Sequence, residues 1–222
     1  MSTKYKAAIF DLDGTLLDTL ADIGNAANDV LAERGHPTHP LDAYRHFIGD
    51  GVATLFTRIL PEGLPTSELI AECVSEFGVT YGRRWNENST LFPGIADLLD
   101  ELTQRKIPIA ILSNKPHEFV GVCVDEFLSA WPFDPILGQR EGIPRKPDPA
   151  GVFEVAQSLG VSPQDCVYVG DSSVDMLTAK NSGALAVGVA WGFRPTEELV
   201  EYGAAHVLNS SPELLKLFAD PH

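Results

Sequence analysis

The stretch AAIFDLDGT, residues 7–15, decides the fold class, because a short apolar run in it stops abruptly at Asp11. An apolar run that is closed by polar residues and glycine is typical of a strand buried in a parallel sheet. Further runs of this kind lie at 107–112, 166–169 and 185–189, and a weaker one lies at 135–137. Amphipathic helical patterns separate them. The sequence therefore predicts an α/β fold with a doubly wound, Rossmann-like parallel sheet and helices on both faces.

The best marked helix start lies near residue 149. Asp148 suits the N-cap and Pro149 suits the first helical position, so we expect the helix to begin at Pro149. Periodicity assigns Phe153 to the buried face of this helix, and it assigns Val122 to the buried face of the preceding one.

Residues 17–88 interrupt the alternation of strands and helices. The segment has helical patterns throughout and no good candidate for a buried strand. We therefore expect a core formed by residues 1–16 and 89–222, with residues 17–88 inserted as an all-helical cap domain. The two connections, near residues 16–17 and 87–89, would act as hinges that let the cap open and close.

Composition limits the partners and the compartment. A formal net charge of −15 over 222 residues argues against nucleic acid and against an anionic membrane surface. Cys73, Cys123 and Cys166 are scattered, which suits a reducing cytosol. The residues before Ala7 are too few for a signal-peptide core, and no run approaches the roughly 20 apolar residues of a membrane helix. These features indicate a cytoplasmic protein. The oligomeric state stays open between a monomer and a homodimer.

Polar side chains gather where ligands bind in doubly wound sheets, outside the carboxyl ends of the strands. Five follow predicted strands, namely Asp11, Asp13, Ser113, Asp171 and Asp175, and Lys146 precedes the helix that Asp148 caps. Grouped carboxylates repel one another unless a cation binds, and oxygen ligands favour Mg²⁺. A lysine and a hydroxyl beside that ion would complete a phosphate cradle. One carboxylate can attack phosphorus while a second protonates the leaving alcohol.

Four segments resemble the motifs of the haloacid dehalogenase-like hydrolase superfamily, in the order that the superfamily has them. They are DLDGT at 11–15, LSNK at 112–115, RKPDP at 145–149 and GDSSVD at 170–175. The resemblance covers essentially the whole chain, including the cap inserted after the first motif.

The resemblance implies a metal site and a nucleophile. Asp11 would be the nucleophile and a metal ligand, and Asp13 would be the general acid and base and would bind the metal through its backbone carbonyl. Asp171 would bind Mg²⁺ directly. Asp175 would support the ion through water or a hydrogen bond, although a carboxylate in the first turn of a helix also favours the helix dipole without any metal.

The resemblance also implies a set of phosphate-binding residues. Ser113 and Lys146 would hold the transferring phosphoryl group, together with Asp11. Gly14 and Thr15 would shape a turn that presents backbone N–H groups to phosphate. Asn114 is placed in the same set.

Asp13 favours a phosphatase over a dehalogenase, because a dehalogenase has no alcohol leaving group to protonate. The predicted cap holds no lysine, which argues against a phosphonatase with a cap Schiff base. The segments LFPG at 91–94, SNKP at 113–116 and GDS at 170–172 are similar to those of phosphoglycolate phosphatases. We therefore expect a small phosphorylated metabolite as substrate, with 2-phosphoglycolate favoured.

Several alternatives stay open at the level of sequence. A sugar-phosphate phosphatase, a pyrophosphatase, a nucleotidase or a sugar phosphomutase would keep the same motifs, and a non-catalytic scaffold is the most remote alternative. The loop Gly49-Asp50-Gly51 either covers the pocket or is a plain turn between helices. Arg45 either binds a substrate carboxylate or faces solvent, and Lys115 either adds charge at the pocket mouth or belongs to a solvated face.

Overall fold

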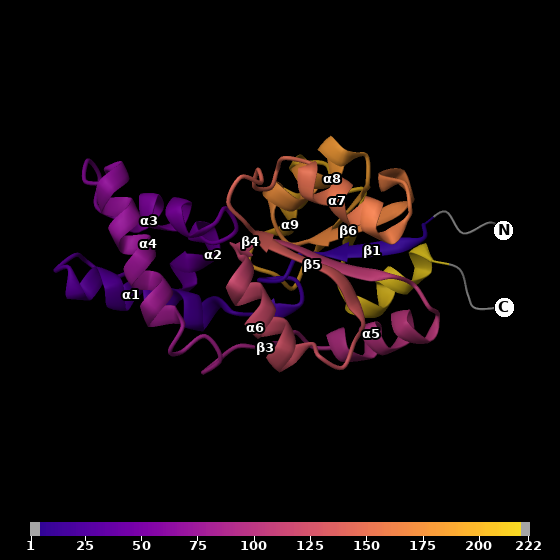
Figure 1. The fold of residues 1–222 in the computed structure, drawn as a ribbon, viewed down its shortest axis with the longest axis horizontal. Coiled ribbons are helices and arrows are strands. Elements are labelled where there is room, and N and C mark those ends of the chain that lie inside the picture. Colours follow the sequence, from indigo (N-terminus) through magenta and orange to yellow (C-terminus); the bar gives the residue numbers. More distant parts are fainter. Residues whose placement is uncertain (1–4, 219–222) are drawn as a thin grey trace.

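A computed structural model describes residues 5–218, so the outermost ends of the predicted core, residues 1–4 and 219–222, lie outside the described residues. Its centre is a six-stranded sheet in the order β5-β4-β1-β6-β7-β8, and every neighbouring pair is parallel (Figure 1). The strands are β1 (Ala7–Phe10), β4 (Ile109–Pro116), β5 (Phe133–Gln139), β6 (Cys166–Gly170), β7 (Leu185–Val189) and β8 (His206–Leu208). This sheet confirms the predicted fold class.

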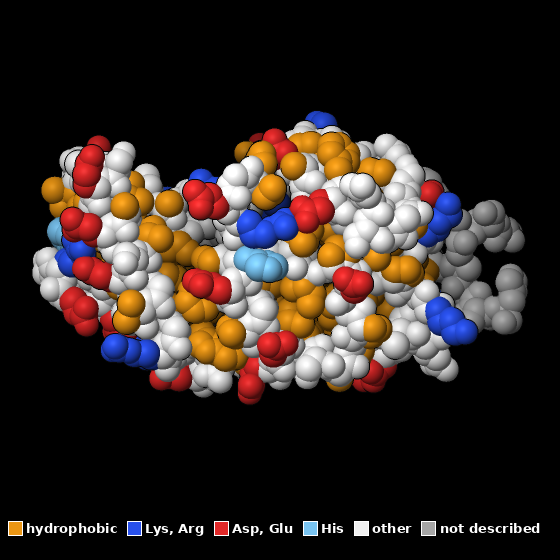
Figure 2. All heavy atoms as spheres, viewed as in Figure 1, with side chains coloured by type: hydrophobic (Ala, Val, Ile, Leu, Met, Phe, Trp, Pro, Cys, Tyr) orange, Lys and Arg blue, Asp and Glu red, His pale blue; other side chains and the backbone are white. Residues whose placement is uncertain are grey.

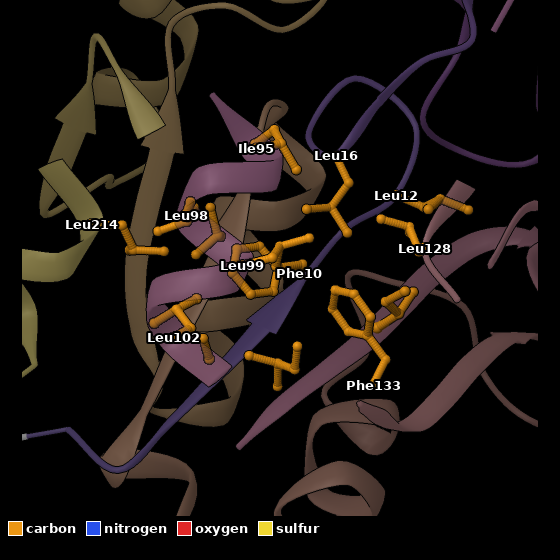
Figure 3. Close-up of a cluster of buried hydrophobic side chains, with 14 of the residues drawn as sticks. Phe10, Leu12, Leu16, Ile95, Leu98, Leu99, Leu102, Leu128, Phe133 and Leu214 are labelled. Carbon is orange, nitrogen blue, oxygen red and sulfur yellow. The ribbon is translucent and has the colours of Figure 1, made fainter. Parts of the chain in front are cut away.

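Helices cover both faces of the sheet. One face packs against α5 (Ile95–Gln104), α6 (His117–Phe127) and the 3₁₀ helix η3 (Ser211–Leu217). The other face packs against α7 (Ala150–Leu159), α8 (Ser173–Ser182) and α9 (Thr196–Glu201), and the 3₁₀ helix η2 (Pro163–Asp165) leads into β6. Successive strand residues point to opposite faces, so β1 sends Phe10 into the first layer and Ile9 into the second. Figure 3 shows Phe10 among Leu98, Leu99 and Phe133.

The inserted segment forms a helical layer beside the carboxyl ends of the strands (Figure 1). It contains α1 (Leu20–Glu33), the 3₁₀ helix η1 (Leu41–Ala43), α2 (Tyr44–Phe47), α3 (Val52–Ile59) and α4 (Ser67–Tyr81). Residues of this segment, together with Phe193 from the loop after β7, form a third hydrophobic cluster beside the two on the faces of the sheet. Two short antiparallel strands, β2 (Leu17–Asp18) and β3 (Thr90–Leu91), join the segment to the sheet.

Several predicted boundaries and faces are wrong. β4 continues to Pro116, so Ser113 lies inside the strand and does not follow it. α7 begins at Ala150, although the Asp148 carboxylate does accept a hydrogen bond from the Ala150 N–H at 2.9 Å. Phe153 and Val122 were predicted to be buried, but they are 47% and 39% exposed. Each lies at the edge of the apolar stripe of its helix, where a side chain can face solvent.

The surface agrees with the acidic composition. Figure 2 shows acidic side chains spread over both the helical layer and the sheet region rather than gathered in one patch. Among the described residues, no helix combines the length and the apolar character that crossing a membrane requires.

Candidate active site

The site begins where β1 ends. Asp11 is the first residue beyond the strand, and its backbone N–H donates to the Val169 carbonyl of β6 at 2.9 Å. This bond extends the parallel pairing by one residue and aims the Asp11 side chain over the carboxyl edge of the sheet. The side chain is buried.

Three buried carboxylates meet at this edge. Asp11, Asp171 and Asp175 each place an oxygen within 4.8 Å of the others. Burial, followed by repulsion from Asp175, raises the pKa of Asp171 well above its ordinary value. Burial also raises the pKa of Asp11 to about 6, although Lys146 acts in the opposite direction. Hard carboxylate oxygens that are crowded and held from water fit a divalent cation, which would relieve their repulsion.

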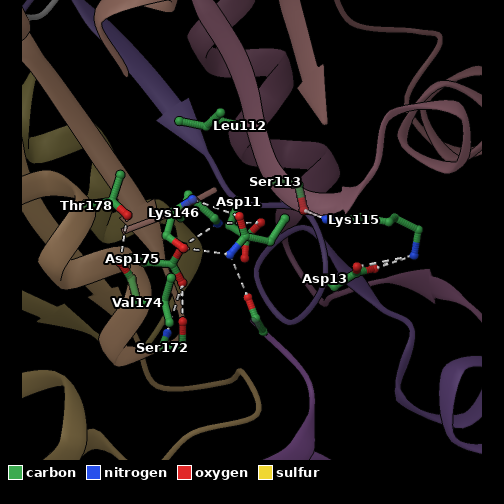
Figure 4. A network of polar contacts seen from close by, with 12 residues as sticks. Asp11, Asp13, Leu112, Ser113, Lys115, Lys146, Ser172, Val174, Asp175 and Thr178 are labelled. Atoms are coloured by element: carbon green, nitrogen blue, oxygen red, sulfur yellow. Dashed lines mark hydrogen bonds and ion pairs between the residues drawn. The ribbon is translucent and has the colours of Figure 1, made fainter. Parts of the chain in front are cut away.

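Lys146 lies against two of these carboxylates, those of Asp11 and Asp175 (Figure 4). Its ammonium donates to Asp175 Oδ1 at 2.7 Å and lies 3.0 Å from Asp11 Oδ1 as an ion pair that is not aligned for a hydrogen bond. Burial alone would lower the pKa of Lys146, but Asp11 and Asp175 raise it well above its ordinary value. The lysine therefore stays charged beside the proposed nucleophile.

Asp175 both caps α8 and faces the acidic cluster. It is the N3 residue of α8, and its Oδ2 accepts from the Ser172 N–H at 3.1 Å and from the Ser172 hydroxyl at 2.7 Å in a capping box. Its Oδ1 faces Lys146 and the acidic cluster. The helix cap therefore fixes the carboxylate that completes the cluster.

The first turn after β1 needs glycine. Gly14 has a φ of +84°, and a Cβ placed on it would lie 2.2 Å from Asp171 Oδ2. A Cβ on Gly192 would lie 2.2 Å from the Asp171 Cβ. Two backbone segments therefore pack directly on the Asp171 carboxylate, which side chains at these positions would displace.

The remaining predicted phosphate ligands lie close by. Ser113 is buried in β4, and Thr15 is buried with no hydrogen-bond partner for its hydroxyl among the described residues. Asn114 is occupied by backbone groups. Its Oδ1 accepts from the Lys146 N–H at 2.9 Å, and its Nδ2 donates to the carbonyls of Lys146 and Gly49, each at 3.1 Å. Asn114 thus holds the Lys146 loop in place, and its phosphate contact stays a prediction.

Asp13 points to the other side of the site, where sequence reasoning missed its partners. Its carboxylate accepts from Lys115 Nζ at 3.0 and 3.2 Å and from the Thr19 hydroxyl at 2.7 Å. Lys115 Nζ also donates to the Tyr81 hydroxyl at 2.8 Å. Burial acts to lower the pKa of Lys115, but Asp13 and Tyr81 raise it above its ordinary value. Lys115 is thus a buried, charged part of the site and does not belong to a solvated face.

A cavity that is partly open to solvent lies between the helical layer and the sheet edge, and its empty space, open solvent included, is about 530 Å³. Asp11, Asp13, Ser113, Asn114 and Lys115 line its floor. Its other lining residues are mainly apolar and come from both layers: Ile23, Ile48, Gly49, Gly51, Val52, Leu55, Phe77, Tyr81, Pro116 and Phe119. Both glycines of the 49–51 loop therefore border the cavity. Arg45 is not in the lining, and it bonds to Asp42 at 3.0 Å and to the Gly192 carbonyl at 3.2 Å.

A loop after β7 connects the helical layer with the acidic cluster. The Phe193 side chain is buried in the hydrophobic cluster of the helical layer, and its backbone N–H donates to Asp171 Oδ2 at 2.7 Å. Arg194 donates to the Ile48 carbonyl at 3.2 Å in the same region. The position of the helical layer and the orientation of Asp171 are therefore linked through one residue, which no motif of the sequence marked.

Comparisons with known proteins agree with this geometry. A family model for haloacid dehalogenase-like hydrolases matches residues 8–189. A phosphoglycolate phosphatase of Pseudomonas putida is 33% identical over 99% of this chain and 82% of its own length. A crystal structure from Lactobacillus delbrueckii subsp. bulgaricus, itself a predicted phosphoglycolate phosphatase, matches with a TM-score of 0.90 and 34% identity over 98% of this chain and 100% of its own.

A predicted phosphoglycolate phosphatase from Haemophilus somnus matches with a TM-score of 0.89 and 26% identity, over 97% of this chain and 98% of its own. The match to the family model spans most of the chain, from the strand before Asp11 to the end of β7. The chain therefore belongs to the haloacid dehalogenase-like hydrolase family, as a phosphoric monoester hydrolase similar to phosphoglycolate phosphatases.

Proposed function

We propose that this protein is a Mg²⁺-dependent phosphatase that hydrolyses 2-phosphoglycolate through an aspartyl-phosphate on Asp11. The observation that carries the proposal is the floor of the cavity, where Asp11 lies in a buried acidic cluster with Lys146 3.0 Å from its carboxylate. The names of the relatives support the substrate, since they are phosphoglycolate phosphatases.

The acidic cluster supports the choice of Mg²⁺. Asp11, Asp171 and Asp175 offer hard oxygen ligands, and Asp13 would add its backbone carbonyl. When bound, the ion would neutralise the substrate phosphate and stabilise the charge that develops on it during transfer. Lys146, already charged and fixed by Asn114, would bind the same phosphoryl oxygens, and Ser113 would add a hydroxyl donor.

The proposed reaction has two displacements on phosphorus. In the first, an Asp11 oxygen bonds to phosphorus, the bond from phosphorus to the alcohol oxygen breaks, and Asp13 gives that oxygen its proton. In the second, the Asp13 carboxylate takes a proton from water as the water oxygen bonds to phosphorus and the bond from phosphorus to the Asp11 oxygen breaks. Inorganic phosphate leaves, and Asp11 and Asp13 return to their starting forms.

We further propose that residues 17–88 act as a cap that excludes water from this reaction. The apolar cavity walls from α1, α3 and α4 support a small substrate, and the β2–β3 pair offers a two-stranded hinge. The protein would act in the cytoplasm, where its three unpaired, buried cysteines suit a reducing environment.

The test is phosphate release from 2-phosphoglycolate beside a panel of sugar phosphates, nucleotides and pyrophosphate, with Mg²⁺ and with EDTA. We expect turnover of 2-phosphoglycolate that disappears in EDTA and in Asp11→Asn. Turnover of a different panel member in its place would reject the substrate and keep the mechanism. A folded, Mg²⁺-loaded protein that releases phosphate from no substrate would reject the phosphatase proposal.

A further inference from the structure

The cavity has two chemically different ends. Its phosphate end holds Asp11 and Ser113, with Lys146 just behind Asp11. Its leaving-group end lies on the other side of Asp13 and is walled by apolar side chains such as Leu55, Phe77 and Phe119. Lys115 is the one basic residue among the described residues that line the cavity.

A charged lysine that is buried in an apolar wall lowers the stability of the fold unless its ammonium has hydrogen-bond or ion-pair partners. The Lys115 side chain is only 4% exposed, and its ammonium has Asp13 and the Tyr81 hydroxyl as hydrogen-bond acceptors. The ammonium also lies 4.7 Å from the centre of the Tyr81 ring. Tyr81 is itself fixed, because its ring stacks on Phe77 with 5.2 Å between ring centroids. The structure therefore holds a rigid pair of polar groups, one of them positive, at the apolar end of the cavity.

The position of this pair fits one class of leaving group. As the general acid, Asp13 must come within about 3 Å of the ester oxygen of the substrate. Lys115 Nζ lies 3.0 Å from that same carboxylate. In a 2-phosphorylated hydroxy acid, only one carbon separates the ester oxygen from the carboxyl group. A substrate seated on Asp13 would thus bring its carboxylate to Lys115 and the Tyr81 hydroxyl.

We propose that Lys115 and Tyr81 bind the carboxylate of the leaving group and so select short 2-phosphorylated hydroxy acids. The inference rests on the proposed function, and it assigns the recognition of the acid to residues outside the phosphate-binding motifs. Lys115 contributes the charge-assisted hydrogen bond and Tyr81 contributes the hydroxyl donor. The apolar walls beside them would keep water from competing and would limit the length of the acid.

A simpler alternative is that Lys115 only positions Asp13. Removal of Lys115 would then slow every phosphomonoester alike, since every leaving alcohol needs the proton of Asp13. A second alternative places the carboxylate on Arg45, which is bound outside the cavity lining to Asp42 and Gly192. A pair of substrates that differ only in the carboxylate separates these alternatives.

The experiment compares kcat/KM for 2-phosphoglycolate and for ethyl phosphate, in which a methyl group replaces the carboxylate. Wild type, Lys115→Met, Tyr81→Phe and the matched control Arg45→Met are measured with saturating Mg²⁺. We expect Lys115→Met to reduce the preference for 2-phosphoglycolate by roughly 10- to 100-fold and Tyr81→Phe by about 10-fold. Arg45→Met should keep the wild-type preference.

Equal losses on both substrates in Lys115→Met would overturn the inference, and so would an unchanged preference in Tyr81→Phe. In either case, turnover of 2-phosphoglycolate by the wild type would still uphold the proposed function. A wild type that does not turn over 2-phosphoglycolate would instead reject the proposed substrate and the inference together. Tyr81→Phe keeps the ring and its stacking, so it decides the question even if loss of the buried Lys115 prevents folding.

Discussion

The two ends of the cavity are built in different ways. The phosphate end is assembled at the carboxyl edge of the sheet, where the ends of β1 and β6 and the loop before α7 bring Asp11, Asp171 and Lys146 together through backbone geometry and short polar contacts. The leaving-group end is assembled from side chains of separate helices, and its polar pair, Lys115 and Tyr81, joins the sheet to α4. The first end suits chemistry common to all phosphomonoesters, whereas the second suits discrimination among them. A change at the phosphate end should therefore affect all substrates alike, whereas a change at the leaving-group end should affect some substrates more than others.

The largest effect is expected for Gly14→Ala. Its Cβ would meet Asp171 Oδ2 at 2.2 Å, so the acidic cluster must shift. Because a displacement of this kind changes the geometry of transfer itself, we expect kcat to fall roughly 100-fold for every substrate. Gly63→Ala is the matched control, since Gly63 has a similar φ of +80° but nothing within 4 Å of its Cβ. A loss confined to one substrate would contradict the assignment of Gly14 to the phosphate end.

Phe193→Ala would test the link between the two ends. The side chain is buried in the cluster of the helical layer, so its truncation should lower the free energy of unfolding by about 3 kcal/mol. Its backbone N–H also orients Asp171, so the rise in melting temperature on adding Mg²⁺ should shrink as well. Phe153→Ala, at a 47% exposed phenylalanine, should change neither quantity. An undiminished response to Mg²⁺ in a destabilised Phe193→Ala would show that the two ends are independent.

Asp22→Asn would weaken the joint between the helical layer and the sheet without touching either end of the cavity. The buried Asp22 carboxylate accepts from the N–H groups of Asn88 and Ser89 and from both of their side chains, at 2.7 to 3.0 Å. An amide nitrogen cannot accept those bonds, so we expect a loss of about 1–2 kcal/mol in the free energy of unfolding by denaturant. Asp97→Asn, at an exposed first-turn residue of α5, should lose only its interaction with the helix dipole, which is about 0.3 kcal/mol in salt. The preference between substrates should stay unchanged, and a changed preference would mean that the joint shapes the leaving-group end.

The last effect concerns pH and the metal-free protein. Burial, although opposed by Lys146, raises the pKa of Asp11 from 3.8 to about 6. The folded protein thus favours the protonated carboxyl, and the stability this contributes is present below about pH 4 and is lost as pH rises through about 6. In EDTA, the melting temperature of wild type should fall relative to that of Asp11→Asn over this range, and Mg²⁺ should reduce the difference. A difference that does not change with pH would contradict the raised pKa.

Sequence predicted the phosphate end better than the leaving-group end, for a physical reason. Asp11, Ser113 and Asp171 occur in short local patterns at strands, and parallel strands bring such patterns to one edge whatever the details of packing. Lys115 meets Asp13 across 102 residues and Tyr81 across 34, and no local pattern encodes that meeting. The same holds for Phe193, a loop residue that becomes part of a cluster formed by another segment.

Local sequence patterns also missed three short strands, and they assigned one helical position to the wrong face. β8 has only three residues, at the edge of the sheet, so its apolar signal is short. β2 and β3 have two residues each and are fixed by their pairing alone. Helical periodicity predicted that Phe153 is buried because it lies at the edge of the apolar stripe of α7. In the structure, this edge position faces solvent.

The central claim is that phosphate is transferred to Asp11. The most direct measurement is mass spectrometry of the peptide that carries Asp11, after acid quench of Asp13→Asn with Mg²⁺ and p-nitrophenyl phosphate. This leaving group needs no proton, so the first displacement should proceed while the loss of the Asp13 base slows the second. The account predicts one phosphoryl group on Asp11. Phosphate on another residue, or unlabelled protein that keeps releasing p-nitrophenol at the wild-type rate, would contradict it.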